Sequence, residues 1–418
     1  MVPFLVRGTP QGCSNGHFLP PMKTRFYRTL TRWFLSFMII QALLPLPRER
    51  VWAIQFVPAQ IRTYLKQGID KGFDLDERGA VAELMEAVEL DRENPLGYAI
   101  LALSHLFFYE MTFDEKEREK EQESMLRFVS EALAKGEKRV ENNPQDGDAF
   151  FAMAAAKLVK VRWDLRHKNY FTASRGAQNT WDYLEKAKEL EPENFDTYFA
   201  MGLLHYHIGH LPGFTRFLSS LLVTSGNRQK GLQELELAAK KGFLFKDLAK
   251  AELLSAYTNF EKQPARALPL AQELNERFPR NYNFLFALAN VHSELRHSEE
   301  AFSLARMIEN GIESGAPPYR PELWSRYYQL LGKIHFDQGE YTEATDYFNR
   351  VLKDNAPYNA RIRAWALVRL GMICDARKER NPAEEYYRKA LDVEGGEGTA
   401  QVAAKEYLKT PYSPANRK

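Results

Sequence analysis

Apolar and polar positions alternate over residues 324–358 with the period of two short amphipathic helices. The segment reads WSRYYQLLGKIHFDQGEYTEATDYFNRVLKDNAPY, and the polar run from Asp337 to Glu340 interrupts the pattern at its centre. This arrangement predicts two helices joined by a turn, with small residues where they cross and large ones facing the next unit. The residues that define the pattern are Leu331, Gly332, Tyr341, Ala344, Phe348 and Val351.

The same spacing of small and large residues recurs on both sides of this segment. Leu370-Gly371 repeats Leu331-Gly332 after 39 residues, and Leu288-Ala289 follows Leu254-Ser255 after 34 residues. The pattern resembles the tetratricopeptide repeat, whose period is about 34 residues. A hairpin with an open apolar face needs neighbours that cover it, so we expect the units to stack.

The resemblance implies an all-α fold, a right-handed solenoid of about seven helical hairpins. We expect the solenoid to span residues 54–395, and a capping helix with a short tail to occupy residues 396–418. The segments DAFFAMA at 148–154 and DTYFAMG at 196–202 are nearly the same first helix written twice.

The N-terminal region has the pattern of an export signal. Four basic residues from Lys23 to Arg32 precede the apolar run WFLSFMIIQALLPLP, and Val51 to Ala53 supply small residues for a signal peptidase. The run is shorter than the 18 or more apolar residues expected of a spanning helix. Cleavage is therefore favoured over an uncleaved anchor, although the charged residues 48–50 keep the anchor open as the alternative.

These observations divide the N-terminus as follows. We expect residues 1–21 to lie upstream of the true start, residues 22–53 to form the signal peptide, and the mature chain to begin at Ile54. The predicted location is the periplasm or cell envelope, as an exported protein.

Composition narrows the function classes. The chain has 44% hydrophobic and 27% charged residues and a net charge of +2, which gives no reason to expect a nucleic-acid partner. Cys374 is the only cysteine of the predicted mature chain, because Cys13 lies before it. No disulfide can then form within that chain.

Histidines form the most conspicuous candidate metal site. His205, His207 and His210 lie within LLHYHIGHL, and closely spaced imidazoles can bind zinc or copper. Four histidines, however, share one repeat position, three residues after the small residue of the first helix, which predicts a packing role and no bound metal or other cofactor. These four are His105, His205, His292 and His335.

The sequence lacks the common catalytic motifs. It contains no glycine-rich phosphate loop, no G-x-S-x-G, no H-E-x-x-H and no C-x-x-C. No catalytic residue is predicted, and an enzyme remains only as an alternative with a site that no motif reveals.

An apolar insertion at 209–226 departs from the repeat. Its large side chains recur at helical spacing, which predicts a short helix with one apolar face. This face either packs on the neighbouring hairpins or contacts a partner or membrane surface. The candidate contact residues are Leu211, Phe214, Phe217 and Leu218.

Residues 196–292 also resemble a eukaryotic family of tetratricopeptide-repeat proteins associated with outer membranes and inclusion bodies. The likeness consists of the apolar insertion with its Leu-Pro, a Gly-Asn-Arg turn and a following Gly-Leu helix. It implies no catalytic residues.

The function that this sequence favours is a non-enzymatic scaffold that binds a protein or peptide in its concave groove. The alternative is a membrane-associated accessory of an envelope complex that docks through residues 211–222. In the resembling superfamily, the first helix of each unit lines the groove. Carried onto this chain, the groove positions are Asn283, Phe286, Asn290, Arg326, Gln329, Lys333 and Phe336.

Overall fold

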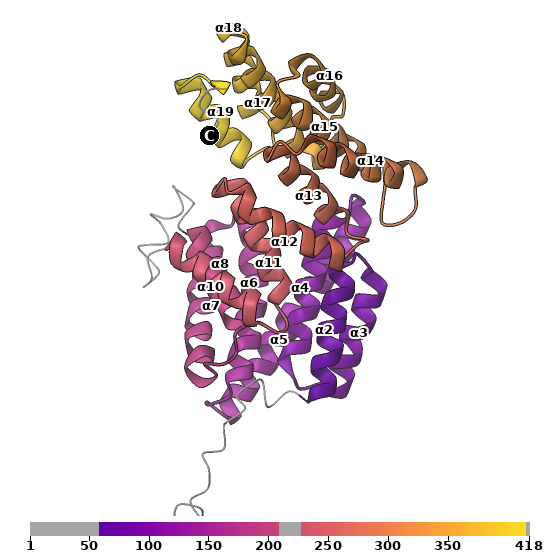
Figure 1. Cartoon of the computed structure of the whole chain (residues 1–418). Coiled ribbons are helices and arrows are strands. Elements are labelled where there is room, and N and C mark those ends of the chain that lie inside the picture. The colour runs from indigo at the N-terminus through magenta and orange to yellow at the C-terminus, as the bar shows by residue number, and fades with distance from the viewer. Residues whose placement is uncertain (1–57, 209–226, 415–418) are drawn as a thin grey trace, which may run out of the picture. The chain divides into compact units, whose positions relative to one another are not determined.

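A computed structural model describes residues 58–208 and 227–414 of the chain. These residues belong to the second of two units, 52–418. The predicted signal region and the apolar insertion lie outside the described residues. All regular elements within the described ranges are helices (Figure 1). None of them combines the length and apolar character needed to cross a bilayer.

The helices pack in successive antiparallel pairs, and each pair packs on the next (Figure 1). The first four pairs are α2 (Ala59–Phe73) with α3 (Glu77–Leu90), α4 (Pro95–Met111) with α5 (Glu115–Asn142), α6 (Gly147–Arg166) with α7 (Tyr170–Leu190), and α8 (Thr197–Ile208) with α10 (Arg228–Lys241).

Four further pairs follow, and a single helix ends the stack. They are α11 (Lys246–Ser255), extended by the π-helical turn η1 (Ala256–Phe260), with α12 (Pro264–Arg277), α13 (Tyr282–Glu294) with α14 (Ser298–Ser314), α15 (Trp324–Gln338) with α16 (Tyr341–Leu352), and α17 (Ala360–Ala376) with α18 (Arg380–Leu391), then α19 (Thr399–Lys409). The short 3₁₀ turns η2 (Pro321–Leu323) and η3 (Pro357–Asn359) precede α15 and α17. The expectation of an all-α solenoid of hairpins is confirmed, with eight pairs in the described residues.

Close helix crossings explain the small residues of the repeat. A Cβ atom added to Gly332 would lie 2.6 Å from the Phe348 ring, and one added to Gly371 would lie 2.5 Å from the Tyr387 ring. No side chain fits at those distances, so glycine lets each first helix approach the aromatic residue of its second helix. Gly68 of the first hairpin meets Leu84 in the same way, at 2.5 Å.

The turn between the helices of six pairs uses one residue with a positive φ angle, directly before the second helix's N-cap. In α15/α16 this residue is Gly339, with φ 84°. The other five pairs place a non-glycine residue there, which costs about 1–2 kcal/mol of backbone strain per turn. These five are Leu75, Lys168, Lys262, Arg296 and Lys378.

The terminal helix α19 covers the last pair, as the sequence predicts. Ala400 and Ala404 are buried against α17 and α18. The Arg380 guanidinium donates hydrogen bonds to the carbonyl oxygens of Tyr407 and Leu408, at 3.0 and 2.9 Å. Because the last carbonyls of a helix have no partner within it, this contact stabilises the end of α19.

Candidate functional site

An apolar cavity of about 670 Å³ is lined by the first helices of four successive pairs, α4, α6, α8 and α11, and by residues of α17 and of the segment that begins α19. Each of these helices turns one stripe of side chains toward it, at the spacing expected of residues on a single helix face. Leucines dominate the stripes: Leu103, Leu106, Leu158, Leu165, Leu203 and Leu248. The cavity therefore presents mainly hydrocarbon, with a few polar groups among it.

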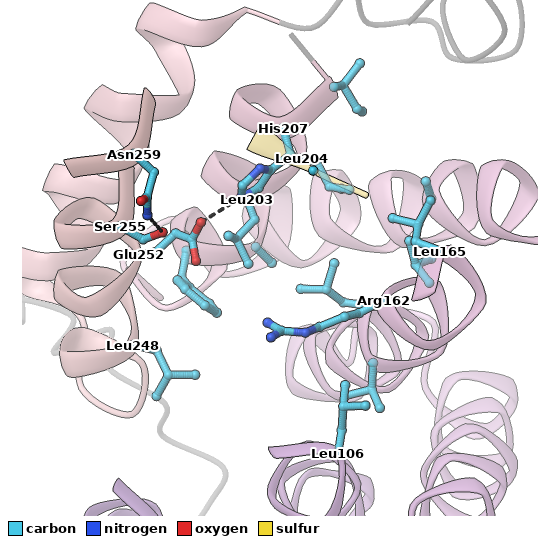
Figure 2. Close-up of a pocket in the computed structure, with 18 of the residues that line it drawn as sticks. Leu106, Arg162, Leu165, Leu203, Leu204, His207, Leu248, Glu252, Ser255 and Asn259 are labelled. Atoms are coloured by element: carbon cyan, nitrogen blue, oxygen red, sulfur yellow. Dashed lines mark hydrogen bonds and ion pairs between the residues drawn. The ribbon is translucent and has the colours of Figure 1, made fainter. Parts of the chain in front are cut away.

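Two polar pairs lie on one wall of the cavity (Figure 2). His207 on α8 and Glu252 on α11 are hydrogen-bonded, with 2.6 Å between Nε2 and Oε1. One turn further along, the Asn259 amide donates a hydrogen bond to Ser255 Oγ at 3.2 Å. Ser255 follows Glu252 by three residues, so the same stripe of α11 carries both polar groups and Leu248.

Arg162 on α6 projects from another side. Its Nε and Nη2 atoms donate to the two carboxylate oxygens of Glu110 on α4, at 2.9 and 2.5 Å. The side chain is nevertheless 61% exposed, and Figure 2 shows its guanidinium pointing into the space between α6 and α11. Its exposed surface thus faces the cavity, with Leu248 and Glu252 on the side toward which the guanidinium points (Figure 2).

The charges of these groups are set by their neighbours. Burial favours the neutral form of Glu252, but the hydrogen bond and charge of His207, with the charge of Arg162, lower the pKa of Glu252 below its ordinary value. Burial likewise opposes the charge of Arg162, yet the Glu110 carboxylate raises the pKa of Arg162. At neutral pH Glu252 and Arg162 therefore place a carboxylate and a guanidinium on different walls of the cavity, and Arg361 and Glu397 line it as well.

The structure differs from the predicted groove at three positions. Phe286 and Phe336 are core residues, 0% and 2% exposed, because α13 and α15 pack these side chains against neighbouring helices. Lys333 is buried as well, and its ammonium pairs with Asp337 at 2.8 Å and Glu294 at 3.5 Å. The expectation that these three side chains line an open groove is therefore wrong in this structure.

The other predicted groove residues lie together, but mostly bond to each other. The Arg326 guanidinium donates to Asn283 Oδ1 at 2.5 Å and lies 4.2 Å from the centre of the Phe286 ring. Burial lowers the pKa of Arg326 to about 10. Asn290 donates to the Phe286 carbonyl at 2.8 Å, and Gln329 is half-buried. Their role in partner binding stays a prediction.

The expectation that the first helix of each repeat lines a groove does identify residues of the cavity, when the same repeat positions are taken in the upstream repeats. The segments 148–154 and 196–202 are nearly identical, so the rule transfers from one to the other by their alignment. Equivalent positions line the cavity: Phe151, Ala155, Leu158, Phe199 and Leu203. The repeat positions are thus sufficient to predict these residues as cavity lining. Arg162, His207 and Glu252 could be placed in the cavity only from the structure, because Glu252 comes from another hairpin.

The histidines of the shared repeat position have local partners. His105 pairs with Glu121 at 2.6 Å and His205 with Glu234 at 2.5 Å, in each case across one buried helix pair. His335 pairs with Glu340 at 2.6 Å, and His292 contacts His297 at 3.3 Å. These contacts agree with the predicted packing role. Within 58–208 and 227–414, no group of three or more His, Cys, Asp or Glu side chains is arranged to hold a metal ion.

Several predicted site residues lie outside the described residues. His210 and the candidate contacts Leu211, Phe214, Phe217 and Leu218 fall in 209–226. Their roles stay predictions, as does the resemblance of residues 196–292 to the eukaryotic family.

Comparison with known proteins adds the following. A tetratricopeptide-repeat family model matches residues 324–393, and no curated protein matches the chain. The human IFIT1 dimer with PPP-AAAA is 14% identical over 86% of each chain, with a TM-score of 0.41. A monomeric IFIT1 mutant with Gppp-AAAA is 14% identical over 89% of this chain and 90% of its own, with a TM-score of 0.42. The P58(IPK) TPR domain is 12% identical over 84% of this chain and 98% of its own, with a TM-score of 0.23.

The assignment rests on the repeat match and on the hairpins themselves. The matched residues 324–393 contain α15/α16 and α17/α18. The close glycine crossing seen in both pairs recurs in α2/α3, at the other end of the described stack. The chain contains tetratricopeptide repeats, matched over residues 324–393, within a stack of helical hairpins.

Proposed function

We propose that this protein is a non-enzymatic scaffold that holds an apolar segment of a partner protein in the cavity between α4, α6, α8 and α11. The observation that carries the proposal is the cavity itself, about 670 Å³ and lined mainly by leucine and phenylalanine side chains. This volume lies within the range of about 300–1,000 Å³ typical of ligand pockets. Tetratricopeptide repeats suggest a protein-interaction scaffold, and stacked repeats commonly bind partners on the concave surface.

The place of the cavity in the repeat supports this use. First helices line most of it, and Trp365 with residues 396–400 lines the rest. Exposed apolar surface of this kind is costly in water, so a partner that covers it gains about 25 cal/mol for each Å² buried.

We further propose that the protein acts outside the cytoplasm, in the periplasm or cell envelope. Support comes from the basic and apolar N-terminal sequence and the Val51 to Ala53 cleavage signal. N-terminal sequencing of protein made in a secreting host tests this part, with Ile54 as the expected first residue. An intact Met22 in the membrane fraction would instead support the uncleaved anchor.

Site-specific photo-cross-linking tests the scaffold function. A photoreactive amino acid at Leu203 faces the cavity, whereas the same amino acid at Ala134 lies exposed on α5, outside the cavity lining. We expect position 203 to capture a discrete partner in the producing cells, position 134 not to, and mass spectrometry to map the cross-link to an apolar segment. Equal capture from both positions, or none from position 203, would contradict the proposal.

A further inference from the structure

We infer that the cavity selects a short apolar peptide whose main-chain amide lies between Arg162 and Glu252. This inference rests on the proposed scaffold function and specifies the chemistry of the segment held there. It follows from the polar atoms that line the cavity and that the protein itself leaves without partners.

Arg162 offers one unused edge of its guanidinium. Nε and Nη2 are both occupied by Glu110, but Nη1 makes no hydrogen bond to any described residue. Because the guanidinium is a rigid fork, the Glu110 contact fixes the direction of the remaining N–H groups. Those groups face the cavity (Figure 2).

Glu252 offers the opposite kind of group. Oε1 is bonded to His207, whereas Oε2 has no hydrogen-bond partner in the described ranges. Beside it, Asn259 uses its amide nitrogen toward Ser255, and its carbonyl oxygen has no partner there. One wall of the cavity thus presents unused acceptors, and Arg162 presents unused donors.

Arg162 and Glu252 are not paired with each other: each binds a different side chain, and no ion pair joins them. A ligand group between them must accept from Arg162 and donate to Glu252. A peptide unit does both, since its C=O accepts and its N–H donates.

Ligands with a net charge fit this pair less well. An anion drawn to Arg162 would lie near the ionised Glu252, and a cation drawn to Glu252 would lie near Arg162. Such repulsion disfavours a charged ligand beside these two groups. An uncharged amide avoids it, while the surrounding leucines accommodate apolar side chains on either side of that amide.

Calorimetric titration with the capped peptide acetyl-Leu-Ala-Leu-Leu-amide tests the inference. A series of analogues replaces one main-chain N–H at a time by an ester oxygen, which removes a donor and keeps the shape. We expect the full-length mature protein to bind the peptide, and one ester position to weaken binding roughly ten-fold, as for a hydrogen bond to a charged group.

Two cavity variants identify the partners. Arg162→Lys can keep a cation for Glu110 but lacks the second donor edge, and Glu252→Gln keeps the size of the side chain and an acceptor for His207. We expect each variant to weaken binding of the peptide several-fold. The sensitive ester analogue should respond much less to Glu252→Gln, because the donor that Glu252 binds is already missing. Unchanged melting temperatures confirm that both variants are folded. A variant that melts early is replaced by Asn259→Ala, which removes the unused carbonyl oxygen beside Glu252 and leaves both charges in place.

The outcomes separate this inference from the proposed function. Equal affinity for all ester analogues, or tighter binding of dodecanoate than of the peptide, would overturn the amide inference and leave the cavity as a binding site of another kind. Failure of position 203 to cross-link any partner would overturn the scaffold function. Binding of the peptide with the expected ester and variant pattern supports the inference directly.

Discussion

His207 and Glu252 join two different repeats, since His207 lies on α8 and Glu252 on α11, and their side chains meet at 2.6 Å on the cavity wall. The carboxylate in turn lies in the field of Arg162, which projects from α6. Three helices from three hairpins therefore determine the charge of one wall. A contact of this kind is a product of repeat stacking, because residues 45 apart in sequence are brought together only when the hairpins pack.

Glu252 gives the first prediction, which concerns acid stability. The folded state holds the pKa of Glu252 below its ordinary value. The ionised Glu252 therefore contributes its full stabilisation above about pH 4.3, the pKa of a glutamate in the unfolded chain. This contribution is lost as the pH falls through the lower pKa of Glu252 in the folded protein. We expect the free energy of unfolding, measured by urea denaturation, to fall less between pH 5 and pH 3 in Glu252→Gln than in the wild type. Identical pH profiles of wild type and variant would contradict the assigned charge.

Asp148, in the first turn of α6, and Asp196, directly before α8, occupy equivalent positions of the repeat but have different surroundings. Asp196 accepts three backbone N–H groups, from Phe243, Leu244 and Phe245, at 2.9–3.0 Å. Neither side-chain oxygen of Asp148 accepts a hydrogen bond from a backbone N–H or a basic group of the described residues, and its carboxyl group lies beside that of Glu191. Burial, with the charges of Glu191 and Asp146, raises the pKa of Asp148 to about 7.

Opposite effects of the same substitution follow at these two positions. The raised pKa means that folding favours the protonated form, so the contribution of Asp148 to stability is complete below about pH 4 and is lost as the pH rises through 7. We expect Asp148→Asn to raise the free energy of unfolding at pH 8 and to have little effect at pH 4. Asp196→Asn should lower it by about 1–3 kcal/mol, because one acceptor becomes a donor facing an N–H group. Chemical denaturation at pH 4 and pH 8 compares them, and equal effects at both positions would refute the distinction.

The strained hairpin turns give a prediction about backbone conformation. Arg296 has φ 60° in the turn between α13 and α14, and its side chain is exposed. Glycine adopts this conformation without the steric cost of a Cβ atom, so Arg296→Gly should raise the free energy of unfolding by about 1 kcal/mol. The reverse change Gly339→Ala, at φ 84° in the equivalent turn, should lower it by a similar amount. Thermal melts of both variants measure this, and shifts in the same direction would contradict it.

The helix crossing gives a prediction about packing. Ala344 is 0% exposed where α16 crosses its partner, whereas its neighbour Glu343 is exposed. Ala344→Leu should cost about 1–3 kcal/mol, because the larger side chain forces the helices apart. Glu343→Gln, on the exposed face, should cost little. Melting curves that coincide for the two variants would refute the assigned repeat register.

Repeat pattern was sufficient to predict the all-α stack, because the small residues that permit close crossings recur at fixed spacing. Gly332 and Gly371 could be read directly from the sequence. The transfer of groove positions succeeded for the stripe containing Ala155 and Leu203, and failed at Phe286, whose side chain is covered by neighbouring helices. Position within a repeat thus determines which way a side chain points, whereas the packing of adjacent pairs determines whether it stays open.

The polar wall could not be predicted for a different reason. The spacing of His205, His207 and His210 suggested a local metal site, but the partner of His207 comes from α11. Nothing within one hairpin specifies that pairing. The free edge of Arg162 is equally non-local, because it depends on Glu110 of α4 holding the other edge.

The most direct test of the account is the affinity of acetyl-Leu-Ala-Leu-Leu-amide for a protein whose cavity has been filled. Ala155 lines the cavity, so Ala155→Trp should occupy that space, whereas Ala134→Trp adds the same side chain to the exposed face of α5. Isothermal titration calorimetry on both variants, with melting temperatures as the check on folding, measures the effect. We predict that Ala155→Trp abolishes detectable binding and that Ala134→Trp binds as the wild type does. Undiminished binding by a folded Ala155→Trp variant would contradict the claim that this cavity is the binding site.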